Sequence, residues 1–187
     1  LILFNMKSSQ ILSYCSYTTI RRNKTYCTLQ PNPKQKVYLK KLDDKNIPLV
    51  LGVGPAGTGK TLLACKVAIE HLLDNRVKKV VITRPIVHLG NDMGFLPGTL
   101  EDKMDPWLVP VYDSMKHSLT QSTIKQMVNN NIIEICPLAY IRGRTFDDTF
   151  LIADEMQNSS INEMKTLLTR LGKNSKVAIT GDLDQSD

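Results

Sequence analysis

The sequence predicts a three-layer α/β fold, in which helices cover both faces of a mostly parallel sheet. Apolar runs of strand length alternate along the chain with longer segments in which apolar residues recur at helical spacing. At 187 residues the chain has the size of one domain, and its 42% hydrophobic content suits a folded core. No apolar run approaches the roughly 18 residues of a membrane-spanning helix, so we expect a soluble protein without a membrane partner.

The N-terminal segment differs in charge from the rest of the chain. Residues 1–42 contain eight Lys or Arg and no acidic residue, whereas the remaining 145 residues carry 16 basic and 18 acidic residues. The formal net charge of +6 therefore gives little support for a nucleic-acid surface on the folded domain. We expect residues 1–30 to be a disordered leader or a transit peptide, followed by one domain over residues 31–187. The expected location is the cytoplasm, or a mitochondrion or plastid if the leader is a transit peptide.

The first half of the domain is predicted to contain two strands and at least two helices. Residues 49–53 (LVLGV) have the composition of a buried strand, and residues 60–74 have apolar residues at helical spacing. Residues 78–83 (KKVVIT) predict a second strand. The segment 84–118 contains four prolines and is expected to be partly helical, and residues 121–129 predict a short helix.

The second half is predicted to supply three more strands. These cover residues 132–136, 149–154 and 175–182, and the segment between the first two is expected to be a loop. Before the last strand, "SSINEMKTLLTRLG" predicts a helix that begins with a capping box of Ser160 and Glu163. Gly172 suits its C-terminal cap. Its apolar face is expected to consist of Ile161, Met164, Leu167, Leu168 and Leu171.

A glycine-rich turn between the first strand and the first helix gives the clearest chemical signal. Residues 54–61, GPAGTGKT, match the pattern G-x-x-x-x-G-K-[ST] at every fixed position. Such a turn points backbone N–H groups at a phosphate, and the positive end of the following helix faces the same anion. Lys60 is expected to reach the β- and γ-phosphates, and the Thr61 hydroxyl to bind Mg²⁺. The expected nucleotide-binding residues are Gly54, Pro55, Ala56, Gly57, Thr58, Gly59, Lys60 and Thr61.

An acidic pair follows the predicted strand at residues 149–154. Four of the five residues before Asp154 are apolar, so this carboxylate is expected at the carboxyl edge of the sheet, where ligands bind in open α/β sheets. Asp154 would hold Mg²⁺ through water or through Thr61. Glu155 is placed to orient and deprotonate a water that attacks the γ-phosphate. The alternative is a solvated acidic pair that caps the next helix.

A third polar segment follows the last strand, in "ITGDLDQ". Thr180, Asp182 and Gln185 are candidates for sensing the γ-phosphate and its loss. From the residues alone, an ordinary turn capped by Asp182 is nearly as good an explanation.

The order and spacing of the motifs resemble those of the PhoH-like family of P-loop ATPases, which is similar to the first motor domain of superfamily 1 helicases. The resemblance covers residues 31–187. It implies a P-loop NTPase fold of the RecA/helicase-like additional-strand type, with the "KVAIT" strand between those that carry Lys60 and Asp154. It also implies that Thr180, Asp182 and Gln185 lie beside the γ-phosphate. By the same resemblance Gln35, in "NPKQ", reads the adenine edge. The motifs that carry it are "GPAGTGKT", "TRP", "GFLPG", "DPWLVPVYD", "PLAYIRGRT", "DEMQN" and "LTRLG…TGDLDQ".

The resemblance implies an ATPase that uses ATP and Mg²⁺, with Lys60, Asp154 and Glu155 as catalytic residues. RNA or single-stranded nucleic acid is the leading partner. Two other functions stay open, which are a phosphotransferase acting on a small metabolite and a nucleotide-dependent binding module with little turnover. Members of the family usually continue with another strand and helix, so the domain is expected to be truncated at residue 187.

Four arginines are candidates for the partner contacts. Arg84, Arg142 and Arg144 are the candidate contacts to phosphate or polynucleotide. Arg170 is a candidate arginine finger supplied to a neighbouring subunit of a homo-oligomer. A surface ion pair is an equally good explanation for each. Trp107 is expected to be a packing anchor rather than a base-stacking platform.

Overall fold

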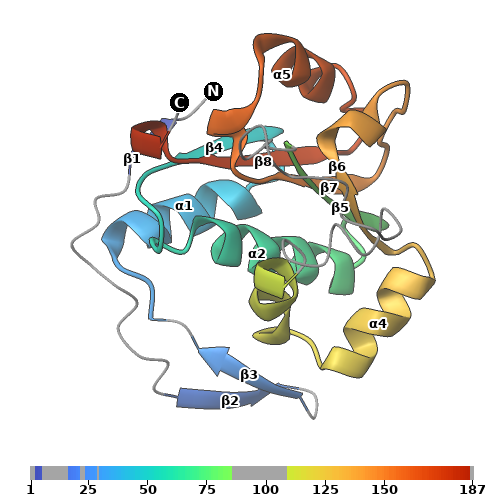
Figure 1. Ribbon diagram of the computed structural model, residues 1–187. Coiled ribbons are helices and arrows are strands. Elements are labelled where there is room, and N and C mark those ends of the chain that lie inside the picture. The colour runs from blue at the N-terminus through green and yellow to red at the C-terminus, as the bar shows by residue number, and fades with distance from the viewer. Residues whose placement is uncertain (1–2, 6–16, 22–23, 29, 86–108, 186–187) are drawn as a thin grey trace, which may run out of the picture.

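A computed structural model describes residues 3–5, 17–21, 24–28, 30–85 and 109–185. Its centre is a six-stranded sheet of order β1-β4-β8-β7-β5-β6, in which all neighbouring strands are parallel (Figure 1). The predicted position of the last strand is confirmed, because β8 lies between β4 and β7. The strands are β1 (Leu3–Asn5), β4 (Leu49–Val53), β5 (Lys79–Arg84), β6 (Ile133–Pro137), β7 (Thr149–Ala153) and β8 (Lys176–Gly181).

Helices cover both faces of the sheet, as predicted. One face packs against α1 (Pro33–Asp43), α2 (Lys60–Leu73), α4 (Gln121–Asn129) and a helical stretch at residues 109–116, which share one apolar core. The other face packs against η1 (Leu138–Ile141), η2 (Met156–Asn158) and α5 (Ile161–Leu168) through a second core. Figure 1 shows α1 and α2 on one side of the strands and α5 on the other.

Strand residues divide between the two cores by alternation. In β5, Val80 and Ile82 belong to the core under α2, whereas Val81 belongs to the core under α5. Successive side chains of a strand point to opposite faces, so a central strand buried on both faces is apolar throughout. The apolar runs in the sequence therefore predicted β4, β5, β6, β7 and β8 within one residue at each end, whereas β1 was not predicted.

The segment at residues 84–118 is only partly covered by the structure. Its helical character is confirmed at residues 109–116. "GFLPG" and Trp107 lie outside the described residues, so the expectations for them stay predictions.

Helix α1 was not predicted, although its first turn carries a local signal. Asn32 and Gln35 form a reciprocal capping box, in which each side chain accepts a hydrogen bond from the other residue's backbone N–H at 2.9 Å. Pro33 occupies the first turn, where no N–H donor is needed. Tyr38 packs directly on Gly52 of β4, where an added Cβ would lie 2.9 Å from the tyrosine ring. Helix α1 thus supports the strand that leads into the glycine-rich turn.

The expectations for α5 are confirmed in part. The Ser160 hydroxyl accepts from the Glu163 N–H at 3.2 Å, and the Glu163 carboxylate accepts from the Ser160 N–H at 2.8 Å, which confirms the capping box. The expected Gly172 cap is wrong, because the helix ends at Leu168 and Thr169 is the cap residue. Gly172 instead donates its N–H to the Phe146 carbonyl at 2.8 Å.

The apolar face expected for α5 is also only partly buried. Leu167 is fully buried, and Met164 and Leu171 pack against the core. Ile161 and Leu168 are wrongly assigned to that face, since they are 76% and 40% exposed. The first residue of a helix lies at its rim, where the neighbouring element does not cover it.

Three strands lie within the expected leader. β1 pairs with β4, and β2 (Tyr17–Arg21) forms an antiparallel hairpin with β3 (Lys24–Thr28). The targeting role of residues 1–30 stays a prediction. None of the described helices is both long enough and apolar enough to cross a membrane.

Candidate functional site

Three polar segments meet at the carboxyl edge of the sheet. They follow β4, β8 and β7, which are neighbours in the sheet, so their first residues lie side by side. Backbone contact joins two of them directly, because the Gly54 N–H donates to the Gly181 carbonyl at 3.1 Å. The parallel topology therefore brings together residues that are more than 100 positions apart in the chain.

The glycine-rich turn has the backbone that its sequence predicts. Gly57 and Gly59 have φ angles of 74° and 81°, which favour glycine, and Gly59 is the N-cap of α2. Helix α2 therefore begins at Lys60, with its N-terminal end at the turn. A helix N-terminus presents unpaired N–H donors and a partial positive charge, both of which favour a phosphate.

Lys60 is buried within this turn. Its ammonium donates to the Gly54 carbonyl and, at 2.8 Å, to the Pro55 carbonyl. Burial lowers the pKa of Lys60, and the carboxylates of Glu155, Asp182 and Asp154 oppose that shift. Within the part of the chain that the structure describes, no carboxylate forms an ion pair with Lys60. The ammonium is thus surrounded by negative charge without being neutralised by a direct contact.

Asp154 is the centre of a hydrogen-bond cluster. Its Oδ1 accepts from the Thr61 hydroxyl at 2.6 Å and also from the Thr180 hydroxyl. The side chain is buried, and its backbone N–H donates to the Thr83 carbonyl at 2.9 Å. The cluster brings together the three residues that the sequence placed at the ends of three different elements.

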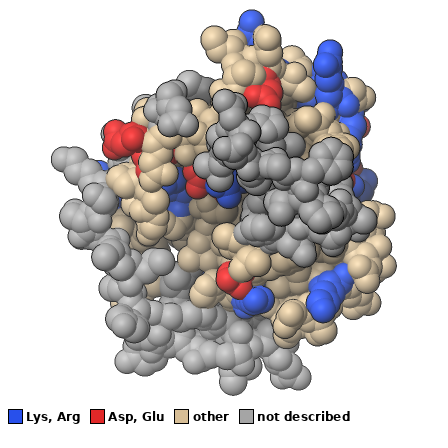
Figure 2. All heavy atoms as spheres, viewed as in Figure 1, with Lys and Arg blue, Asp and Glu red and all other residues tan. Residues whose placement is uncertain are grey.

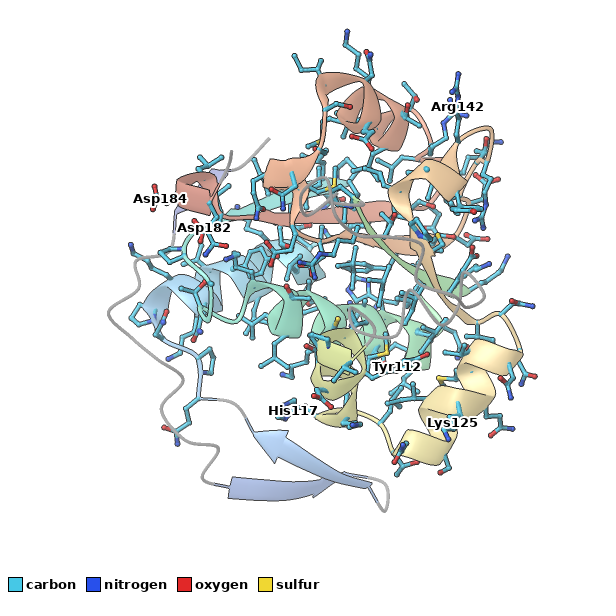
Figure 3. All side chains as sticks on the ribbon, in the orientation of Figure 1. Tyr112, His117, Lys125, Arg142, Asp182 and Asp184 are labelled. Atoms are coloured by element: carbon cyan, nitrogen blue, oxygen red, sulfur yellow. The ribbon has the colours of Figure 1, made fainter. Side chains whose placement is uncertain are left out.

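Asp182 connects the end of β8 to the glycine-rich turn. Its buried carboxylate accepts from the Ala56 N–H at 3.1 Å, and its other oxygen accepts from the Asp184 N–H at 3.2 Å. Gln185 lies in η3 (Leu183–Gln185) with an exposed side chain, and its N–H donates to the Asp182 carbonyl. Asp182 and Asp184 lie at this end of the sheet in Figure 3.

Glu155 lies just past β7 in an unusual backbone conformation. Its φ and ψ of 53° and 40° are in the left-handed region, which for a residue with a Cβ costs roughly 1–2 kcal/mol. Its carboxylate accepts from the Gln157 side-chain amide at 2.6 Å. The Gln157 oxygen in turn accepts from the Asp182 N–H at 3.1 Å. No role was predicted for Gln157, because its partner Asp182 is 25 positions away in the chain.

Gln35 lies against the glycine-rich turn, but its amide is already engaged. It is buried, with Nε2 donating to the Thr58 carbonyl at 3.1 Å and Oε1 accepting from the Asn32 N–H. Gln35 is therefore not an exposed surface glutamine. Recognition of an adenine edge by this amide stays a prediction.

Two of the arginines are committed to contacts within the chain. Arg144 forms two parallel hydrogen bonds of 2.6 and 2.7 Å with Glu134 and stacks 4.8 Å from the Phe146 ring centroid. Arg170 donates to the Arg144 carbonyl at 3.4 Å and to the Thr169 hydroxyl at 3.2 Å. Both therefore have structural partners that a phosphate or a neighbouring subunit would have to replace.

The other two arginines make no ion pair among the described residues. Arg84 ends β5 and lines a small cavity that also includes Thr83 and Asp154. Arg142 is exposed and lines a groove between η1 and α5, together with Lys165. Figure 3 shows Arg142 at the opposite end of the molecule from Asp182, so Arg142 does not reach the site at β4, β8 and β7 of its own chain.

The residues present suit a magnesium ion that is shared with a phosphate. Thr61 and Asp154 supply hard oxygen donors in contact with each other. Among the described residues no group of three or more His, Cys, Asp or Glu side chains is placed to hold a metal. Mg²⁺ usually takes one or two protein ligands and completes its shell with phosphate oxygens and water, so this donor set fits.

The fold and the turn define the class of protein, which is a nucleotide-binding protein of the P-loop type. Comparison with known proteins then identifies the family. The sequence profile described as "PhoH-like protein" matches residues 29–187, and the chain belongs to this family.

The relatives are bacterial proteins that are longer than this chain. The chain is 50% identical over 143 residues to the PhoH-like protein of Bacillus subtilis, covering 76% of this chain and 45% of the relative. It is 45% identical over 168 residues to the PhoH-like protein of Mycobacterium tuberculosis, covering 89% and 46%. It is 40% identical over 161 residues to Protein PhoH of Escherichia coli, covering 85% and 45%. The chain thus spans about half the length of these relatives.

Proposed function

We propose that this site binds ATP together with Mg²⁺ and hydrolyses it. The observation that carries the proposal is the position of Glu155, which directly follows the buried Asp154 and is held by an amide from the adjoining turn. A protein that only bound nucleotide would need the glycine-rich turn, Lys60 and Thr61. Hydrolysis requires in addition a group that deprotonates the attacking water, and the Glu155 carboxylate beside Asp154 can serve as that group.

Binding would use the turn and the start of α2. The N–H groups of the turn would donate to phosphate oxygens, and Lys60 would exchange the Gly54 and Pro55 carbonyls for the β- and γ-phosphates. A bond from the ammonium to an anionic phosphate oxygen is stronger than its bond to a neutral carbonyl, so the exchange is favourable. Thr61 and Asp154 would hold Mg²⁺, which when bound neutralises charge on the phosphates.

Hydrolysis would use Glu155 as the general base. Its carboxylate accepts a proton from a water while the water oxygen forms a bond to the γ-phosphorus. The bond from that phosphorus to the β,γ-bridging oxygen breaks, and ADP and inorganic phosphate leave. Thr180 and Asp182 would sense the γ-phosphate and its loss. The support is that the Thr180 hydroxyl donates to Asp154 and that the Asp182 carboxylate accepts from the Ala56 N–H of the turn.

Phosphate release from ATP in the absence of any acceptor tests the proposal against a phosphotransferase. We expect Mg²⁺-dependent release by the full-length protein, and a loss of about 100-fold or more in kcat for Glu155→Gln with ATP affinity retained. Turnover that appears only after a metabolite acceptor is added would favour the phosphotransferase. Nucleotide binding without turnover would favour the binding module, and parental turnover by Glu155→Gln would show that another group is the base.

RNA or single-stranded nucleic acid is the partner that we propose for this ATPase. The support is the groove lined by Arg142, Lys165 and Glu163, which carries two exposed cations and one carboxylate. It lies beside α5, the helix that follows Glu155 and η2. Figure 2 shows basic side chains at this end of the molecule. Phosphate contacts of this kind weaken steeply with salt.

Stimulation of turnover by single-stranded RNA tests the partner. Arg142→Ala should reduce the stimulation and leave the turnover without RNA unchanged, because Arg142 is remote from the nucleotide site. Equal rates with and without RNA would contradict the proposed partner and leave a protein or metabolite partner. Arg84 and Arg144 are secondary candidates, and Arg170 would act in trans only in a homo-oligomer, which molecular mass in solution would reveal.

A further inference from the structure

Gln157 contacts two segments of the candidate site, although it belongs neither to the glycine-rich turn nor to the Asp154-Glu155 pair. It lies in η2 and is half-buried, and both ends of its side-chain amide are used. The nitrogen donates to Glu155 at 2.6 Å and the oxygen accepts from the Asp182 N–H at 3.1 Å. One side chain therefore connects the segment after β7 with the segment after β8.

We propose that Gln157 is the positioning residue for Glu155, and that it relays the state of the Asp182 segment to the Glu155 carboxylate. This inference rests on the proposed hydrolysis, because it assigns to Gln157 the task of holding the general base. The chain of contacts runs from the Ala56 N–H of the turn to the Asp182 carboxylate, then through the Asp182 N–H to Gln157, and on to Glu155.

The backbone around Gln157 fits this role. Glu155 has a left-handed backbone conformation, which a residue with a Cβ rarely adopts. Contacts with surrounding residues must therefore hold this conformation and, with it, the direction of the side chain. Among the described residues, the side-chain amide of Gln157 donates the hydrogen bond that holds the Glu155 carboxylate. A neutral amide donor orients a carboxylate and leaves it able to accept a proton.

Gly181 provides the space that the amide needs. A Cβ added to Gly181 would lie 3.2 Å from the Gln157 oxygen, which is closer than nine in ten such contacts, so the amide would have to shift by a few tenths of an ångström. The glycine at the end of β8 therefore lets the Gln157 oxygen approach the Asp182 N–H. This gives a second way to displace the amide without changing Gln157 itself.

A double-mutant cycle on kcat separates positioning from a general structural role. We expect Gln157→Ala in the full-length protein to lower kcat about 10- to 100-fold with unchanged nucleotide affinity, and to cause no further loss when Glu155 is already Gln. Gly181→Ala should lower kcat by a smaller factor and add nothing to Gln157→Ala. Ser159→Ala is the matched control, because it removes the bond from Ser159 to the Met156 carbonyl in the same turn without a contact to Glu155. Parental kcat for Gln157→Ala, or an equal loss in both backgrounds, would overturn the proposal.

Hydrogen exchange tests the same link without any turnover. In peptides that span residues 178–185, Gln157→Ala should speed exchange of the Asp182 amide about tenfold or more. Glu155→Ala should also speed it, although Glu155 makes no direct bond to Asp182, because the freed Gln157 amide holds its acceptor position less firmly. A protein that shows this pattern but no ATP turnover would refute the proposed hydrolysis and keep the link. Unchanged exchange in Glu155→Ala would refute the link itself.

Discussion

Two clusters of charged side chains lie on the same sheet and are arranged in opposite ways. Around Glu134 on β6, Arg144 and Lys79 neutralise the carboxylate at 2.6 to 2.7 Å. These contacts, with Arg144 the larger cause, lower the pKa of Glu134 to about 2. At the carboxyl edge of β4, β8 and β7, Lys60 and Asp154 are buried, and neither forms an ion pair within the described part of the chain.

We interpret the cluster at Glu134 as structural and the cluster at Lys60 and Asp154 as the proposed nucleotide site. Buried charges without an opposite partner are unfavourable, and they are common at sites where a ligand supplies the missing charge. Lys60 contacts carbonyls, and Asp154 contacts hydroxyls, so both keep polar partners that a phosphate and a cation can replace. Arg144 differs from Lys60 and Asp154, because its guanidinium already donates two hydrogen bonds to the Glu134 carboxylate.

The largest expected effect is at Lys60. Lys60→Ala should weaken the binding of an ATP analogue about 100-fold, because two charge-assisted hydrogen bonds of roughly 1.5 kcal/mol each are lost. The free energy of unfolding should not fall, since the burial that lowers the pKa of Lys60 also penalises its charge. Lys66→Ala on the same helix is the control, because Lys66 pairs with Glu70 at the surface. Equal affinity of Lys60→Ala and Lys66→Ala for the ATP analogue would contradict the assignment of Lys60 to a nucleotide site.

Arg144 should behave in the opposite manner. Arg144→Ala should lower the free energy of unfolding by about 2 kcal/mol, because it leaves the half-buried Glu134 with Lys79 alone, and nucleotide affinity should stay at the parental value. Denaturant titration and binding of an ATP analogue check the two halves. A large loss of affinity with no loss of stability would move Arg144 into the functional cluster.

Acidification should remove the contribution of the Glu134 ion pairs to the free energy of unfolding. Its pKa is about 2 in the folded chain and about 4.5 when unfolded, so the stabilisation is complete above pH 4.5 and is lost as the pH falls toward 2. The difference in unfolding free energy between the parent and Glu134→Gln should therefore shrink between pH 5 and pH 2.5. Denaturant titrations at several pH values measure it, and a constant difference would contradict the assigned ion pairs.

The smallest effect is expected at the start of α5. Ser160→Ala removes the N-cap hydroxyl and should cost about 1 kcal/mol of stability without changing nucleotide affinity. Thermal unfolding checks the stability. A changed affinity would mean that α5 is coupled to the site more closely than its contacts indicate.

Most of the sheet could be predicted from the sequence, because strands buried on both faces are apolar runs with clear ends. The strands at β4, β7 and β8, and the helix α4, follow this rule or a clear periodicity. Helix α1 could not be predicted as easily, since five of its eleven residues are charged and its stability depends on tertiary contacts such as Tyr38 on Gly52. Its capping box was the available signal.

The candidate site was predictable where a local motif encodes it. The turn and the Asp154-Glu155 pair follow apolar strands and carry their own signature. The role of Gln157 depends on a contact with Asp182, and the engagement of Arg144 depends on Glu134 ten positions earlier. Long-range pairings of this kind are set by the strand order and leave no periodic trace in one sequence.

The most direct test of the proposed nucleotide site is a titration of the full-length protein with a non-hydrolysable ATP analogue, with and without Mg²⁺. We expect one site for each chain, with affinity at least about tenfold higher when Mg²⁺ is present. Asp154→Asn should show no such gain, because Asp154 would hold the ion beside the phosphates. Absence of saturable binding, or an affinity that Mg²⁺ does not change, would contradict the assignment of the buried charges at β4, β8 and β7 to a nucleotide.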